Sequence, residues 1–109
     1  MAKHEFGIME RTPLHGERYD KYEPNKYNCI TVHDNYIECI LEQSLNIDFY
    51  WHTLDVPGKG LAYCGITLIP PTSLKQFIDV ISNKKELAEL RQLLIQAEAE
   101  NKYVIHFGI

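Results

Sequence analysis

The stretch I-D-F-Y-W-H-T-L-D-V-P-G-K-G-L-A-Y-C-G-I-T-L-I, residues 47–69, decides the fold that the sequence predicts. Its first part, 47–54, contains three aromatic residues and a threonine, which suit a β-strand. Pro57 followed by Gly58 predicts a tight turn, because proline presets one backbone dihedral and glycine accepts a positive φ. The chain then returns as a second apolar strand over 61–69. These residues therefore predict two strands joined by a turn.

Strand and helix patterns flank these two strands on both sides. Strands are recognised by short β-branched or aromatic runs, and helices by apolar residues at helical spacing behind a capping residue. In chain order we expect a strand at 27–33, a helix from Asp34 or Asn35 to Asn46, strands at 47–54 and 61–69, a helix in two pieces from Ser73 and from Asn83, and a closing strand at 103–109.

This order predicts an α+β domain with the ferredoxin-like β-α-β-β-α-β arrangement. Right-handed crossovers place the four strands in one antiparallel sheet, in the spatial order fourth, first, third, second, with both helices on one face. Residues 1–26 lack a clear period and contain Pro13 and Pro24, so we expect an extended N-terminal arm that lies along a single domain at 27–109.

Composition restricts the class of protein. The 109 residues suffice for one core, and the formal net charge of −4 removes the basic footprint expected of a nucleic-acid-binding protein. No run of residues is apolar enough for a membrane span, and the charged first 26 residues do not resemble a signal peptide. The three cysteines, Cys29, Cys39 and Cys64, form no Cys-x-x-Cys pair, which predicts reduced thiols in the cytoplasm and no metal or other cofactor.

Strand alternation divides the side chains between two faces of the predicted sheet. The more apolar set belongs on the face that the helices cover: Ile30, Val32, Phe49, Trp51, Cys64, Ile66, Leu68, Ile105 and Phe107. The open face then receives the polar and aromatic set, whose candidate ligand or interface residues are Cys29, His33, Tyr50, His52, Tyr63 and His106. Tyrosine and histidine offer an apolar body with a polar tip, so this face is suited to contact with a partner or ligand. Gly65 and Gly108 would allow a close approach there.

Three sharper interpretations of this face have little support. A metal site of His33, His52 and His106 lacks local ligand spacing. Cys29 could be a nucleophile activated by His33 or His106, and His52 a general acid or base beside Tyr50 or Tyr63, yet no motif marks either.

The segment 58–60, G-K-G, joins two predicted strands and does not open a helix, so it is not a phosphate-binding loop.

The segments Y-W-H-T-L-D (50–55), P-G-K-G (57–60), Y-C-G (63–65) and Y-V-I-H-F-G-I (103–109) resemble small bacterial proteins without an assigned activity. Relatives of this kind sometimes carry a short-chain dehydrogenase label. This chain has no Gly-x-Gly-x-x-Gly after a strand and no Tyr-x-x-x-Lys pair, and it is too short for a dinucleotide-binding sheet. The resemblance implies a bacterial cytoplasmic origin and no activity.

We therefore expect a small cytoplasmic interaction module without catalysis, which uses the open face or the arm to engage a partner. A second copy of the chain is the simplest partner, and a dedicated protein, such as a toxin neutralised by an acidic immunity-type protein, is another. The alternative is a small enzyme or a ligand or metal sensor that uses the histidine and tyrosine cluster as a pocket.

Overall fold

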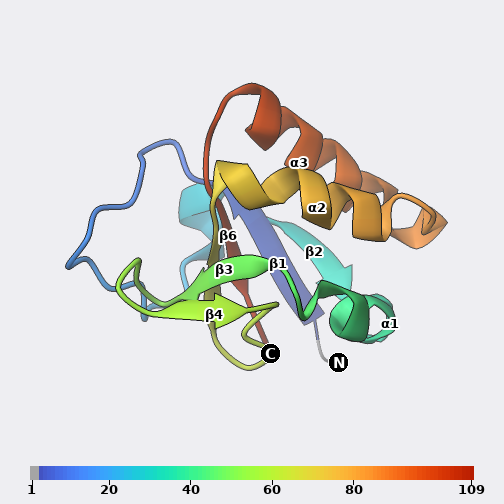
Figure 1. Cartoon of the computed structure of the whole chain (residues 1–109), viewed down its shortest axis with the longest axis horizontal. Coiled ribbons are helices and arrows are strands. Elements are labelled where there is room, and N and C mark those ends of the chain that lie inside the picture. Colours follow the sequence, from blue (N-terminus) through green and yellow to red (C-terminus); the bar gives the residue numbers. More distant parts are fainter. Residues whose placement is uncertain (1–2) are drawn as a thin grey trace.

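One antiparallel sheet of six strands forms the centre of the computed structural model, which describes residues 3–109 (Figure 1). Three α-helices and two short 3-10 helices complete it. In chain order the elements are β1 (Lys3–Ile8), η1 (Pro24–Tyr27), β2 (Ile30–His33), α1 (Asp34–Ser44), β3 (Asp48–Trp51), β4 (Pro57–Lys59), β5 (Ile66–Ile69), α2 (Pro71–Ile81), η2 (Lys85–Leu87), α3 (Ala88–Ala99) and β6 (Val104–Phe107). The spatial order of the strands is β2-β1-β6-β5-β3-β4.

The expected α+β class and single antiparallel sheet are confirmed, but the four-stranded ferredoxin-like order is wrong. Residues 3–8 of the expected arm form β1, which pairs with β2 on one side and β6 on the other. Residues 1 and 2 of that arm lie outside the described part of the chain. The predicted turn contributes a further strand, β4, because the chain reverses at 52–56 and Trp51 N–H donates to the Val56 carbonyl at 3.0 Å.

The predicted helices are present with shifted boundaries. α2 begins at Pro71, which suits the first turn of a helix because proline has no N–H to leave unpaired. Ser73 was expected to cap this helix, but its hydroxyl donates to the main-chain carbonyl of Asp48 at 2.6 Å. The strand predicted at 61–69 is shorter than expected, since 61–65 is a loop closed by the Gly65 N–H on the Ala62 carbonyl at 3.1 Å. Tyr63 and Cys64 therefore lie in a loop and not in a strand.

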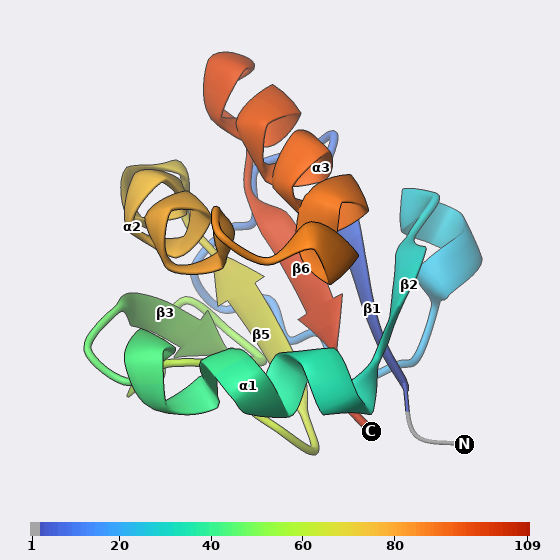
Figure 2. The same ribbon diagram turned by 90° about the vertical axis from the view of Figure 1, so that its right-hand side faces the viewer.

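Both faces of the sheet are covered, which corrects the expectation of an open face. Figure 2 shows α1, α2 and α3 in front of the sheet, and the main core lies between them and the strands. Its members from the strands include Phe6, Val32, Phe49, Ile69 and Val104. A second core of Met9, Ile66, Leu68, Ile105 and Phe107 lies on the other face, where Tyr19 and Tyr27 pack against it.

The face assignment is right for the strands at β2 and β3 and wrong for β5 and β6. Phe49 and Val32 join the helix-side core as expected, but Ile66, Leu68, Ile105 and Phe107 belong to the second core. Consequently Thr67 and His106, which pair across β5 and β6, point to the helix side. The expected arm supplies part of the cover, because Met9 belongs to the second core and Tyr19 packs against it.

Candidate functional site

The structure divides the six predicted site residues among four places. His106 and Tyr63 join a buried polar chain on the helix side. His52 lies in a surface cleft at the end of β3. Tyr50 and Cys29 pack against the second core, and His33 accepts a hydrogen bond from the Asn35 N–H at 3.1 Å as the N-cap of α1.

The three-imidazole metal site is wrong, since its members are separate. His106 is fully buried on the helix side, His33 caps a helix, and His52 lies at the surface. Among residues 3–109, no group of three or more His, Cys, Asp or Glu side chains is placed to hold a metal ion.

The buried polar chain runs from Thr67 to Tyr63 through two histidines and a carboxylate. Nδ1 of His106 lies 3.2 Å from Oγ1 of Thr67, and Nε2 of His106 lies 2.8 Å from Nδ1 of His4. On the other side of His4, Nε2 lies 2.8 Å from Oδ1 of Asp34. The Tyr63 hydroxyl donates to Oδ2 of the same carboxylate at 2.7 Å. Every polar group in this chain therefore has a partner, as burial requires.

One arrangement of protons satisfies every hydrogen bond from Thr67 to Tyr63 and leaves a single charge in this buried network, on Asp34. Burial, with a smaller contribution from His4, lowers the pKa of His106 well below its ordinary value, so His106 is neutral. Hydrogen bonds from Tyr63 and His4 lower the pKa of Asp34 and favour its carboxylate form. That carboxylate raises the pKa of Tyr63 to about 12. The tyrosine therefore keeps its proton and donates it to Asp34.

The buried polar chain of side chains from Thr67 to Tyr63 has a structural role, because His4 and His106 have no exposed surface that a substrate could reach. His106 and Tyr63 are among the predicted site residues, whereas His4 and Asp34 are not. The expected arm at 1–26 leaves His4 without a predicted role, and Asp34 is predicted only as a helix cap. The alternation of His4, Phe6 and Ile8 was the available signal, since it has the period of a strand.

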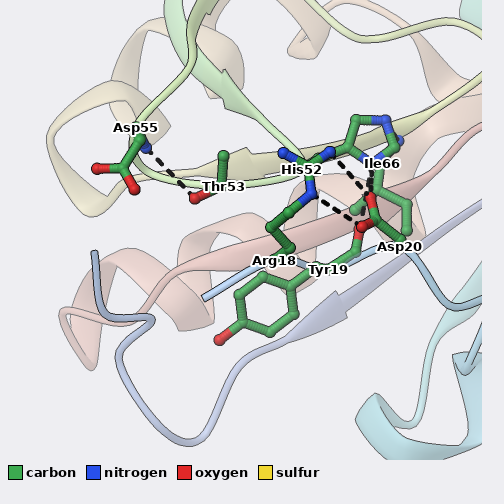
Figure 3. A network of polar contacts seen from close by, with 7 residues as sticks. All are labelled: Arg18, Tyr19, Asp20, His52, Thr53, Asp55 and Ile66. Atoms are coloured by element: carbon green, nitrogen blue, oxygen red, sulfur yellow. Dashed lines mark hydrogen bonds and ion pairs between the residues drawn. The ribbon is translucent and has the colours of Figure 1, made fainter. Parts of the chain in front are cut away.

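His52 occupies a constrained position just beyond β3 (Figure 3). Its φ of 64° lies in the left-handed region, which histidine adopts more readily than most residues. Its main-chain N–H donates to the Ile66 carbonyl at 2.9 Å, and its carbonyl accepts from the Tyr19 N–H at 2.7 Å. The main chain of His52 is therefore fixed between β5 and the segment that follows β1.

The partners of the His52 imidazole determine which nitrogen carries the proton. Nδ1 lies 2.9 Å from Oδ1 of Asp20 and 3.2 Å from the Tyr19 carbonyl (Figure 3), and both of these groups can only accept. Nε2 faces the Ile66 N–H at 3.5 Å, a long contact in which it accepts. A neutral His52 thus holds its proton on Nδ1 and its lone pair on Nε2. Arg18, 3.0 Å from Asp20, is the main cause of the lowered pKa of that carboxyl group.

A cleft of about 190 Å³ surrounds this imidazole. The side chains that line it include Asp20, Tyr22, His52, Cys64 and Phe107, together with Gly65 and Gly108. The two glycines do permit close approach, although it is the protein's own atoms that approach. A Cβ on Gly65 would lie 2.8 Å from Nε2 of His52, and one on Gly108 would overlap the Tyr63 carbonyl oxygen.

Cys29 does not have the environment of a nucleophile. It is half-buried beside Gly7, and burial, helped by the charge of Glu5, raises the pKa of its thiol to about 12. His106, its proposed activator, points to the opposite face of the sheet. The interpretation of Cys29 as a thiol activated by His106 is therefore wrong.

A larger groove of about 480 Å³ runs between α3 and the β2 side of the sheet. Its apolar walls are Ile8, Ile30, Leu93 and Ile95, and its polar rim includes Glu10, Lys26, Gln92 and Gln96. This groove does not follow from the sequence pattern, because it depends on the position of β1 between β2 and β6.

Comparison with known proteins assigns no family. No protein-family model, no curated protein and no solved structure matches this chain. The resemblance to small bacterial proteins therefore stays a prediction, and so does the cytoplasmic location. Within the described range, 3–109, no helix has the length and hydropathy needed to cross a bilayer.

Proposed function

We propose that this protein is a small interaction module that assembles with a second copy of itself through the free edge of β2. The observation that carries the proposal is the character of this edge. β2 is the outermost strand on its side of the sheet, with β1 as its only strand partner among residues 3–109. Its sequence, I-T-V-H, contains none of the lysine, glutamate or proline residues that discourage pairing at sheet edges.

Pairing two β2 strands in antiparallel fashion satisfies twofold symmetry. With the symmetry axis at Thr31, Ile30 of one copy lies beside Val32 of the other, and both belong to the same face of the sheet. No lysine, arginine, aspartate or glutamate within β2 meets a like charge in this register. The net charge of −4 on each copy consequently does not oppose contact at the strand itself.

The groove beside β2 supports the same arrangement. Because the two strands run in opposite directions, the α1 end of one copy lies at the Ile30 end of the other. Tyr36, in the first turn of α1, is 41% exposed. In the proposed dimer, Tyr36 of one copy comes next to the groove of the other copy, which Ile30 helps to line. An aromatic side chain that enters an apolar groove is the kind of contact that dominates many interfaces. Twofold symmetry provides this contact twice.

Analytical ultracentrifugation of the untagged protein over a range of concentrations tests the proposal. We expect a dimer, and we expect Thr31→Asp to yield a monomer, because two carboxylates would then meet at the symmetry axis. Thr31 is exposed but pairs with Glu5 of β1, so circular dichroism and urea unfolding of the variant must first show that it still folds. The matched control is Thr12→Asp, which adds the same charge at an exposed site away from β2. A wild-type protein that stays monomeric, or a dimer that Thr31→Asp leaves unchanged, overturns the proposal.

A further inference from the structure

The groove between α3 and the β2 side of the sheet offers apolar surface that the fold leaves partly uncovered. Its volume of about 480 Å³ falls within the range of roughly 300–1,000 Å³ that small-molecule sites occupy. Four aliphatic side chains from three elements form its walls: Ile8 of β1, Ile30 of β2, and Leu93 and Ile95 of α3. All four are only partly buried, although they pack against the main core. A ligand that covers their remaining surface gains the free energy of apolar burial.

Two charged side chains line this groove, and only one of them has an opposite charge beside it. Glu10 binds the Lys102 ammonium at 2.6 Å, a partner that it shares with Glu100. Among the ion pairs of residues 3–109, none involves Lys26. The Lys26 ammonium lies 5.6 Å from the centroid of the Tyr27 ring, within reach of a cation–π contact. Since Tyr27 also lines the groove, this contact keeps an unpaired positive charge at the groove wall.

Side-chain amides complete the rim. Asn28, Gln92 and Gln96 line the groove, and the Gln96 amide donates to Glu100 at 3.1 Å. Asn28 follows Lys26 by two residues, at the C-cap of η1, and its amide N–H groups can donate to an anion. A phosphate monoester, with a charge of about −2 near neutral pH, would bring more negative charge than Lys26 offsets. Apolar walls and a single unpaired ammonium instead fit a molecule with an aliphatic chain and one carboxylate.

We propose that this groove binds a small aliphatic carboxylate, with its chain against the four aliphatic walls and its head group at Lys26 and Asn28. In the proposed dimer the same groove receives Tyr36 of the second copy, so ligand and assembly compete for it. This competition rests on the proposed function, whereas the binding site itself does not. A ligand that only the monomer binds shifts the equilibrium by mass action, so the carboxylate regulates assembly.

Isothermal titration calorimetry at neutral pH tests the site with hexanoate, octanoate and decanoate. We expect the Kd to fall about fourfold for each added methylene group, because each one is buried against the aliphatic walls. Octan-1-ol and octylammonium carry the same chain as octanoate with a neutral and a positive head group. We expect both to bind at least about threefold more weakly than octanoate. Equal affinity for octanoate and octan-1-ol, tighter binding of octylammonium, or no binding of any carboxylate overturns the proposal.

Three substitutions at exposed positions test the role of charge at the rim. Lys26→Gln should weaken octanoate binding at least about threefold and leave octan-1-ol binding unchanged. Gln92→Glu adds a carboxylate to the rim and should also weaken octanoate binding. Lys75→Gln is the matched control, because Lys75 is an exposed lysine of α2 that does not line the groove. A loss in Lys75→Gln as large as that in Lys26→Gln overturns the assignment of the head group.

Thr31→Asp, once shown to fold, separates this inference from the proposed dimer. Octanoate should bind this variant at least as tightly as the wild type, and it should shift the wild-type protein toward monomer in sedimentation. If the wild type is monomeric at every concentration and still binds octanoate, the dimer is wrong and the site stands. If the dimer forms and neither protein binds octanoate, the site alone is wrong. A dimer that stays intact with octanoate bound overturns the competition.

Discussion

The imidazole rings of His4 and His106 are stacked inside the protein, with their centroids 5.1 Å apart and their planes 14° from parallel. One nitrogen of each ring is hydrogen-bonded to the other across 2.8 Å, although the residues are separated by 102 positions in the sequence. Both rings are fully buried. Two imidazoles in such contact cannot both be charged, which links protonation to folding.

Acid is expected to destabilise the protein already near pH 6. His106 has a folded-state pKa well below its ordinary value of 6.5, whereas in the unfolded chain it takes up a proton near 6.5. Below that pH the unfolded state binds more protons, so stability falls as the pH falls, by up to about 1.4 kcal/mol per pH unit for one group. The lowered pKa of Asp34 adds a further loss in more acidic solution. Urea unfolding between pH 8 and pH 5 measures this slope, and a flat profile would contradict the assignment of a neutral His106.

Replacement of His106 by leucine, a residue of similar size, is expected to destabilise the protein by about 1–3 kcal/mol. The change leaves Nδ1 of the buried His4 without its partner, whereas the Thr67 oxygen still accepts from the Ala62 N–H at 2.8 Å. His15→Leu is the matched control, because the His15 side chain is 77% exposed and its charged partner is the surface residue Asp55. We expect that control to stay within about 0.5 kcal/mol of wild type in the same urea measurement. Equal effects for the two variants would rule out an organising role for the buried chain.

Cys29 is expected to be unreactive in the native protein, because burial raises the pKa of its thiol to about 12. Titration with a chromophoric disulfide should therefore detect Cys39 and Cys64 in the folded protein and all three cysteines in denaturant. The variant Cys29→Ala should leave the native titration unchanged. A native titre that includes Cys29 would show that the second core opens readily.

Tyr36→Ala is expected to weaken the proposed dimer by at least about tenfold in Kd, since it removes the aromatic side chain assigned to the groove. Leu45→Ala is the control. Leu45 is 54% exposed, but it lies at the far end of α1 from β2. Sedimentation of both variants beside the wild-type protein measures the effect. Similar dissociation constants for the two variants would place the interface elsewhere.

Local patterns were sufficient to predict the helices and most of the strands, because those depend on spacing and capping within a few residues. β1 was missed for a physical reason. Lys3–Ile8 mixes charged, polar and glycine positions with two apolar ones. Glu5 is buried in it and accepts a hydrogen bond from the Tyr22 hydroxyl. That stabilisation comes from a part of the chain that carries no strand or helix signal of its own.

The candidate site was predicted less well than the fold, because side-chain faces are set by what covers them. All four residues of β5 and all four of β6 are buried, so alternation could not tell one face from the other. Predicted site residues such as His52 and His106 were consequently grouped on one face when the structure separates them. Asp20 and His4, their actual partners, lie in the first 26 residues, where periodicity gave no guidance.

The central position of β1 also governs how the chain reaches its native state. β1 joins β2 to β6, so the two halves of the sheet stay unconnected until residues from opposite ends of the described chain meet. A contact that spans most of the sequence carries a large entropic cost of loop closure before any hydrogen bond offsets it. Chains with many such contacts fold slowly. The same pairing that buries His4 against His106 is therefore expected to form late and to limit the folding rate.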